Sequence, residues 1–110
     1  MNTQPFLSLL GLARRAGRLA MGHDAAGDAM QTGQGCLLIL AGDLSPRTRR
    51  DMVRMAQETG TALLETSLSM EDIAQAVGRR TGILCTTDAG FAKKFEQLGE
   101  SLFINHQPNE

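Results

Sequence analysis

The stretch from Leu9 to Met30, LLGLARRAGRLAMGHDAAGDAM, decides how we expect this chain to fold and where we expect it to bind. It joins an arginine-rich helix end, a short strand and the glycine-led start of a second helix. Gly22 lets the backbone turn sharply, and the helix after it offers unpaired N–H groups and a positive dipole to phosphate. Arg14, Arg15 and Arg18 add cationic donors nearby. This junction predicts an RNA-binding edge, and nothing in it indicates catalysis.

Length and composition predict one domain over residues 1–110, with a polar tail from about residue 105. The chain has 110 residues and is 42% hydrophobic, enough to bury a single core. No apolar run reaches the ~20 residues that cross a membrane, and the start lacks the basic region of a signal peptide. We therefore expect a cytoplasmic protein. Cys36 and Cys85 lack metal-ligand spacing, so we expect reduced core thiols and neither a metal nor another cofactor.

The net charge of −1 conceals an asymmetry between the two halves of the chain. Residues 1–56 hold seven arginines and four aspartates, whereas residues 57–110 hold four cations and eight acids. Nine of the eleven cations are arginine, which suits bidentate contact with phosphate better than lysine does. An anionic partner is therefore expected on the N-terminal half. Arginine-rich genomic composition is the alternative explanation.

Apolar spacing predicts helices that alternate with strands. The predicted helices run from Gln4 to Ala16, from His23 to Thr32, from Pro46 to Thr59, from Ser69 to Gly78 and onward from Asp88; the predicted strands are Arg18 to Met21, Cys36 to Ala41, Ala62 to Thr66 and Gly82 to Thr86. The run CLLILA, from Cys36 to Ala41, is typical of a buried strand at the sheet centre. This alternation predicts a helix-sheet-helix sandwich with mainly parallel pairing.

Local signals support the helix ends and their inward faces. Ser45 before Pro46, and Ser69 three residues before Asp72, are typical helix starts, and Gly60 is a typical stop. The predicted inward residues are Phe6, Leu9, Leu10 and Ala13 in the first helix, Met52, Val53, Met55 and Ala56 in the third, and Phe91, Phe95 and Leu98 in the last.

Three motifs together resemble a known family. They are LLGLARRAGRLAMG near the start, Asp43, Ser45 and Thr48 within AGDLSPRTRR, and TDAGFAKKF near the end. In this order and spacing, the chain from about Phe6 to Leu98 resembles the bacterial YlxQ-like branch of the kink-turn RNA-binding ribosomal proteins, the superfamily of archaeal large-subunit protein seven-Ae.

The resemblance implies an α/β fold, a three-layer α-β-α sandwich around a four-stranded mixed sheet, without enzymatic activity. Family members clamp a sharply bent RNA element, the kink-turn, between the start of the second helix and a loop before the last strand. In this chain the corresponding residues begin at Gly22 and include the loop of Gly78, Arg79, Arg80 and Thr81. A helix start and a flanking loop are suited to splayed nucleotides.

The chain departs from the family signature at the second helix start. The family has glycine, a polar residue, Asn and Glu there, with a Lys three positions further on, whereas this chain has Gly22, His23, Asp24, Ala25 and Asp28. One carboxylate is replaced by a methyl group and one cation by an anion. Asp28 would therefore oppose phosphate, while Asp24 still accepts from base amino groups.

Each of these features also has a purely structural interpretation. His23 is then a solvated residue at a helix start, and Asp24 and Asp28 complement the helix dipole. Gly78 to Arg80 end a helix with cations at its negative end. The cluster of Arg47, Arg49, Arg50 and Arg54 is interpreted as a solvated helix face in preference to an RNA surface.

Three functions follow from the sequence. The main hypothesis is a non-catalytic protein that binds structured RNA, either ribosomal RNA or another kink-turn RNA, with the ribosome as one setting and no membrane partner. The alternative is a protein-interaction or regulatory module on the same fold, as in the stress-response Gadd45 proteins, with a ribosomal or regulatory protein partner. A small enzyme has the least support, because the sequence lacks a nucleophile elbow, a phosphate loop and a metal-ligand set.

Overall fold

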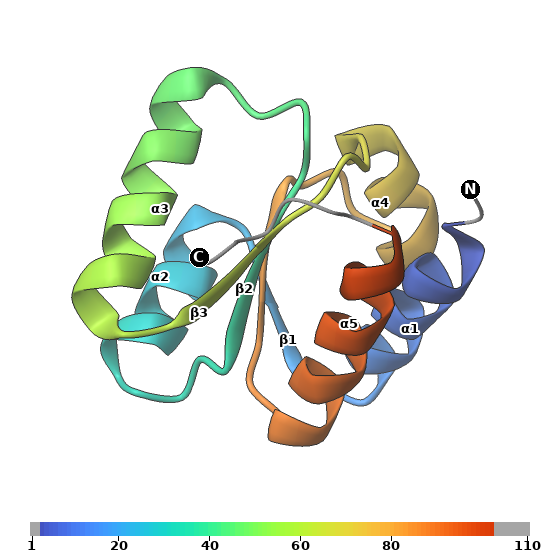
Figure 1. The fold of residues 1–110 in the computed structure, drawn as a ribbon, viewed down its shortest axis with the longest axis horizontal. Helices are drawn as coiled ribbons and strands as arrows, with labels where there is room; N and C mark the ends of the chain where they lie inside the picture. The colour runs from blue at the N-terminus through green and yellow to red at the C-terminus, as the bar shows by residue number, and fades with distance from the viewer. Residues whose placement is uncertain (1–2, 103–110) are drawn as a thin grey trace.

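The computed structural model describes residues 3–102, and their side chains as far as Gly99. Within these residues, five helices surround a four-stranded sheet (Figure 1). In chain order the elements are α1 (Gln4–Arg15), β1 (Leu19–Met21), α2 (His23–Gln31), β2 (Leu37–Leu40), α3 (Pro46–Thr59), β3 (Ala62–Glu65), α4 (Met70–Val77), β4 (Ile83–Thr86) and α5 (Ala89–Leu102). The polar tail predicted from about residue 105 lies outside the described residues.

The sheet is mixed, in the strand order β1-β4-β2-β3. β2 pairs parallel with β3, with Leu38 opposite Leu63. β4 pairs antiparallel with both β1 and β2, and Cys85 lies opposite Ala20 on one side and Leu38 on the other. The inner position predicted for the CLLILA strand is confirmed, because every residue of β2 is buried. The prediction of mainly parallel pairing was wrong, since two of the three strand pairs are antiparallel.

The reversed direction of β4 follows from the position of α4. β1, β2 and β3 all run the same way, as expected for strands joined by crossover helices. α4 has only eight residues and packs against α1, so the chain leaves β3 and enters β4 at the same end of the sheet. Backbone hydrogen bonds tie the loops at this end, from Ala41 N to Gly82 O at 2.9 Å and from Gly42 N to Leu68 O at 2.7 Å. We call this end the carboxyl edge; it lies uppermost in Figure 1.

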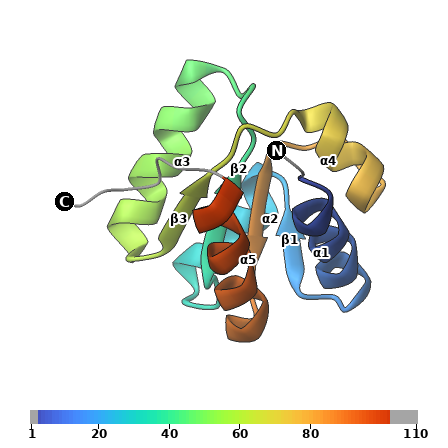
Figure 2. The ribbon, with the colours of Figure 1, turned by 45° about the vertical axis from the view of Figure 1, so that its right-hand side comes forward.

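Two helix layers cover the two faces of the sheet (Figures 1 and 2). α2 and α3 pack on one face, where Met30 and Met52 are buried against Leu38 and Cys85. α1, α4 and α5 pack on the other face. There the rings of Phe6 and Phe95 lie 5.1 Å apart between their centroids. The three-layer α-β-α sandwich implied by the resemblance is confirmed.

The predicted inward residues all belong to the two cores, to different depths. Phe6, Leu9, Leu10, Ala13, Met52, Ala56 and Phe95 are buried, whereas Val53, Met55, Phe91 and Leu98 are half-buried at the margins of the cores. Burial of these side chains provides the main driving force for the fold. The apolar periodicity therefore identified the core faces of α1, α3 and α5.

The predicted helix ends are also confirmed. Ser45 Oγ accepts from Thr48 N at 3.2 Å at the start of α3, and Gly60 ends that helix in the left-handed region at φ 71°. Ser69 and Asp72 form a reciprocal capping box at the start of α4. Asp88 Oδ1 accepts from Phe91 N at 3.0 Å in the first turn of α5. These contacts are local in sequence, which is why the pattern of residues predicted them.

Both cysteines are free and lie in or beside the inner strands. Cys85 is buried in β4, and this burial raises the pKa of its thiol to about 11. Cys36, just before β2, is half-buried. Among the described residues, no helix has the length and apolar character needed to span a membrane.

Candidate nucleic-acid interface

Gly22 lies at the carboxyl edge between β1 and α2, in contact with the loop that leads into β4. Its backbone has φ 97° and ψ 167°, a region that residues with a side chain rarely adopt. Its N–H donates to Ile83 O at 2.8 Å. A Cβ atom at Gly22 would lie 3.1 Å from Nη2 of Arg79. The structure therefore brings together a helix start and a guanidinium group that are far apart in sequence.

The start of α2 differs from the starts of α3 and α4 at the same edge. Ser45 caps α3, and the Ser69 capping box closes α4. The carboxylate of Asp43 also accepts from Met70 N at 3.0 and 3.3 Å. No side chain caps α2, whose first helical hydrogen bond runs from Ala26 N to Gly22 O. The first N–H groups of α2 are therefore left for an outside acceptor.

The polar residues in the first turns of α2 are accessible from outside. His23, Asp24 and Asp28 are all exposed. His23 Nδ1 lies 3.4 Å from Oδ1 of Asp24, so the imidazole has a neighbouring acceptor when it is protonated. Two carboxylates therefore stand on the same helix whose start faces the Arg79 guanidinium, and the local charge at this edge is mixed.

The loop from Gly78 to Thr81 combines two free cations with a structural turn. Gly78 ends α4 in the left-handed region at φ 77°. Arg79 and Arg80 are exposed, and neither forms an ion pair with any of the side chains described between residues 3 and 99. Thr81 is only 8% exposed, and its hydroxyl donates to Ile83 O and accepts from Ile83 N, both at 3.2 Å. Thr81 therefore shapes the loop, and the two arginines are its accessible donors.

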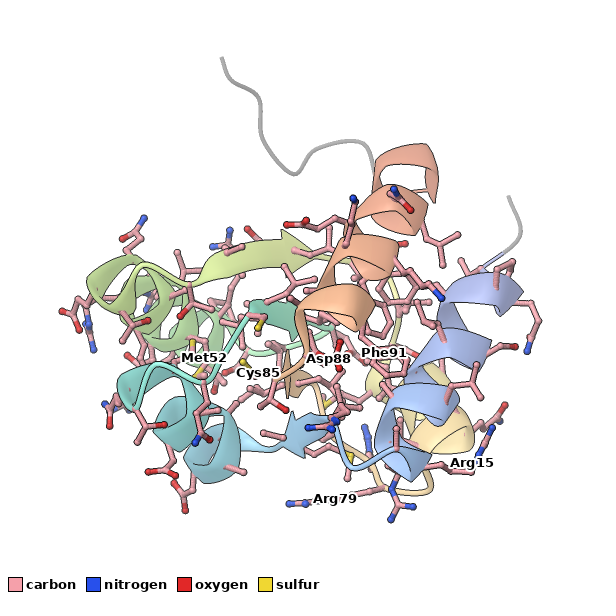
Figure 3. All side chains as sticks on the ribbon, turned by 90° about the horizontal axis from the view of Figure 1, so that it is seen from below. Arg15, Met52, Arg79, Cys85, Asp88 and Phe91 are labelled. Carbon is pink, nitrogen blue, oxygen red and sulfur yellow. The ribbon has the colours of Figure 1, made fainter. Side chains whose placement is uncertain are left out.

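The arginines of the first cluster do not all lie beside Gly22. Arg14 and Arg15 occupy the exposed last turn of α1, and Arg15 lines a groove of about 510 Å³ between α1 and α4. Figure 3 shows Arg15 and Arg79 on the same side of the molecule, away from Asp88. Arg18 lies at the opposite end of β1, where its Nε is 4.0 Å from Oδ2 of Asp88. The structure therefore does not bring Arg18 to the carboxyl edge.

One ion pair of the α3 arginine cluster, between Arg49 and Glu65, joins residues 16 positions apart and could not be predicted from the sequence. Arg49 forms a bidentate pair with Glu65 of β3, at 2.5 and 2.8 Å, and this contact raises the pKa of Arg49. Arg54 Nη2 lies 3.3 Å from Oδ1 of Asp51. The link between Asp43 and Met70 was also missed, because 27 residues separate the two. The capping preference of Asp was the only available signal.

Comparison with known proteins assigns the chain to a family. The profile of the ribosomal protein L7Ae/L30e/S12e/Gadd45 family matches residues 5–96. This chain belongs to that family. Within the L7Ae/L30e/S12e/Gadd45 family, it is 28% identical over 99 residues to the RNA-binding protein YlxQ of Enterococcus faecium. That alignment covers 90% of this chain and 95% of the relative, which confirms the YlxQ-like resemblance.

Two solved structures share the fold. A protein of unknown function from Bacillus halodurans superposes with a TM-score of 0.80 at 29% identity, covering 86% of this chain and 96% of the other. The 15.5kD RNA binding protein of Giardia lamblia superposes with a TM-score of 0.73, covering 91% and 86%. At 14% identity, the second comparison shows the fold alone. The sheet and helix layers therefore match those of both solved structures along most of the chain.

Proposed function

We propose that this protein binds structured RNA, and that the start of α2 and the Arg79 loop form the binding edge. The observation that carries the proposal is the guanidinium of Arg79 placed against Gly22, beside the uncapped first turn of α2. N–H groups at a helix start and a nearby guanidinium are both suited to phosphate. Arg80 adds exposed positive charge in the same loop, whereas Arg14 and Arg15 are exposed in the last turn of α1, next to Arg18.

The relatives support RNA as the partner. The Enterococcus faecium protein is named as RNA-binding and is similar over almost its whole length, and the structural match from Giardia lamblia carries the same description. A helix start beside a loop favours bent RNA with splayed nucleotides over a regular duplex. The RNA is therefore proposed to be a kink-turn or a similar bend, with the ribosome as its setting and the cytoplasm as the location.

The accessible side chains favour binding over catalysis. Arg79, His23 and Asp24 are all exposed at the edge. Proton transfer and nucleophilic attack depend on groups that are partly buried and oriented by a partner, whereas contact with a polyanion needs accessible donors. We therefore propose a non-catalytic role.

A second candidate function is favoured by the acids of α2. Asp24 and Asp28 are exposed beside the proposed phosphate contacts, where they repel an anion. The same two carboxylates are suited to a basic segment of another protein. A protein-interaction or regulatory module is therefore the alternative.

A panel of RNAs of equal length, containing a kink-turn, a stem-loop and a perfect duplex, tests the proposal by fluorescence anisotropy. We expect the kink-turn or the stem-loop to bind more tightly than the duplex. Affinity should fall as salt rises, with a slope that corresponds to about three to five phosphate contacts. Equal affinity for duplex and kink-turn would reject recognition of RNA shape. Absence of binding at low salt would favour the protein-interaction module.

A further inference from the structure

The outer face of α3 carries a row of arginines that the proposed binding edge does not use. Arg47, Arg50 and Arg54 are spaced by three and four residues, so they lie on one face of the helix. All three are exposed, whereas Met52 and Ala56 face the core. We call these three residues the α3 arginine stripe. Arg49 is not part of it, because it is held by Glu65.

Most of the charge in the stripe is not neutralised within the protein. Arg54 forms an ion pair with Asp51. Arg47 and Arg50 have no carboxylate within ion-pair distance in the described part of the chain. Figure 1 places α2 beside α3 in the same layer. The exposed polar face of α2 carries the acids Asp24 and Asp28, so the positive surface of this helix layer is the arginine stripe on α3.

Helix stability does not account for the stripe. The first turn of α3 contains no acidic residue, although the positive end of the helix dipole favours acids and disfavours cations there. The short helix α4 follows the usual rule, with Glu71 and Asp72 in its first turn. Arg47 and Arg50 therefore stand at the end of α3 where their charge destabilises the helix. A sequence that breaks a local rule without a compensating contact often does so for binding.

The stripe begins at the same edge as the proposed site. α3 starts directly after the loop that follows β2, at the carboxyl edge, and packs over β3. Neighbouring strands are about 4.8 Å apart, so the β3 side of this edge lies roughly 14 Å from β1 and Gly22. An RNA held at Gly22 therefore needs to extend only a few nucleotides to reach α3.

We propose that the α3 arginine stripe binds the phosphate backbone of a double-helical arm of the RNA whose bend lies at Gly22 and Arg79. This inference rests on the proposed function. Exposed arginines without an apolar neighbour in the row are suited to a regular series of phosphates, and such contacts carry no base specificity. The stripe therefore adds affinity and sets the direction of the arm, while the edge selects the bend.

The experiment uses two kink-turn RNAs, one with short arms and one with an arm extended by about ten base pairs, one helical turn. The test variant is R47A/R50A. The matched control is K93A/K94A, which removes two exposed cations from α5 in the opposite layer. R79A measures how much the carboxyl edge contributes to binding of each RNA. Anisotropy is measured over a salt series, and thermal unfolding is recorded for each variant.

We expect R47A/R50A to weaken binding of the extended RNA about 10-fold and to lower its salt slope by roughly two, while the short-arm RNA binds as before. R79A should weaken both RNAs, and K93A/K94A should change neither. The melting temperature of R47A/R50A should stay the same or rise, because two cations leave the positive end of α3.

Three results would overturn the inference. If R79A weakens both RNAs but R47A/R50A behaves like K93A/K94A, the stripe is a solvated helix face and the proposed function stands. If R47A/R50A weakens both RNAs equally, the stripe does not contact the arm. If the unchanged protein binds neither RNA, the inference fails together with the proposed function, and an acidic protein segment becomes the partner to test on the stripe.

Discussion

The starts of α2 and α4 lie at the same edge of the sheet, yet the protein treats them differently. At α4, the Ser69 capping box and the carboxylate of Asp43 satisfy the first backbone N–H groups. At α2, Gly22 provides no side chain, and a Cβ atom there would contact the guanidinium of Arg79, itself a donor. At the start of α4, side chains of the protein accept hydrogen bonds from the backbone N–H groups. At the start of α2, the N–H groups and Arg79 are all donors, and no side chain accepts from the helix start.

This difference separates the needs of folding from those of binding. Side-chain caps typically stabilise a protein by about 1 kcal/mol, and α4 has only eight residues, so it depends on them. α2 lacks this stabilisation, because no side chain caps it, and under the proposed function its N–H groups and Arg79 bind an external anion. The four predictions below test this contrast.

The largest effect is expected for Gly22→Ala, which strains the backbone and displaces Arg79. A side chain at this φ costs of order 1–3 kcal/mol, and the new Cβ would lie 3.1 Å from Nη2 of Arg79. RNA affinity should fall at least about 10-fold. Gly60→Ala is the control, because Gly60 also has a positive φ but its Cβ would meet nothing within 4 Å. Urea unfolding should show that both variants are less stable, and anisotropy should show weaker RNA binding only for Gly22→Ala. An equal loss of RNA affinity in Gly60→Ala would contradict a special role of the α2 start in binding.

Removal of the loop cations should affect binding alone. We expect Arg79→Ala combined with Arg80→Ala to weaken RNA binding by about 1–3 kcal/mol and to leave the melting temperature nearly unchanged, because exposed charges contribute little to folding. Arg18→Ala is the control, since Arg18 lies beside Asp88 at the other end of β1. A lower melting temperature with intact binding would show that the loop arginines serve only to end α4.

Reversal of the charge at Asp28 should strengthen RNA binding at the start of α2. Asp28→Lys replaces repulsion of phosphate with attraction, so affinity for a kink-turn should rise about 10-fold, equivalent to about 1.4 kcal/mol. The salt slope should steepen by about one phosphate. Glu96→Lys is the control, because Glu96 is exposed on α5 in the opposite helix layer and undergoes the same charge change. If Asp28→Lys leaves both affinity and slope unchanged, α2 does not face the RNA.

The smallest effect is expected at the closed helix start. Ser69→Ala removes the acceptor for Asp72 N and should destabilise the protein by about 1 kcal/mol. RNA affinity should remain the same, because this start is satisfied within the protein. Ser67→Ala, a nearby exposed serine that caps no helix, is the control. If Ser69→Ala loses RNA affinity under conditions in which the variant is fully folded, the starts of both α2 and α4 contact the RNA.

Part of the candidate site could be predicted from residues close together in sequence. Gly22 followed by helix-forming residues indicated a sharp turn into α2, and the structure has this turn. The contact between Arg79 and Gly22 spans 57 positions, and no local pattern in the chain encodes it. The family resemblance supplied that pairing. The sequence grouped Arg18 with Gly22, whereas the structure places Arg18 at the opposite end of β1, because a strand separates residues that are near in sequence.

The sequence by itself determined the elements of this protein, their capped ends and their buried faces, because these depend on interactions between residues a few positions apart. Only the tertiary structure decided that β4 runs opposite to its neighbours, that Asp43 closes the start of α4 and that Arg79 lies against Gly22. Each of these depends on α4 packing against α1 and returning the chain to the carboxyl edge. That packing is a contact between distant segments, which no local periodicity records.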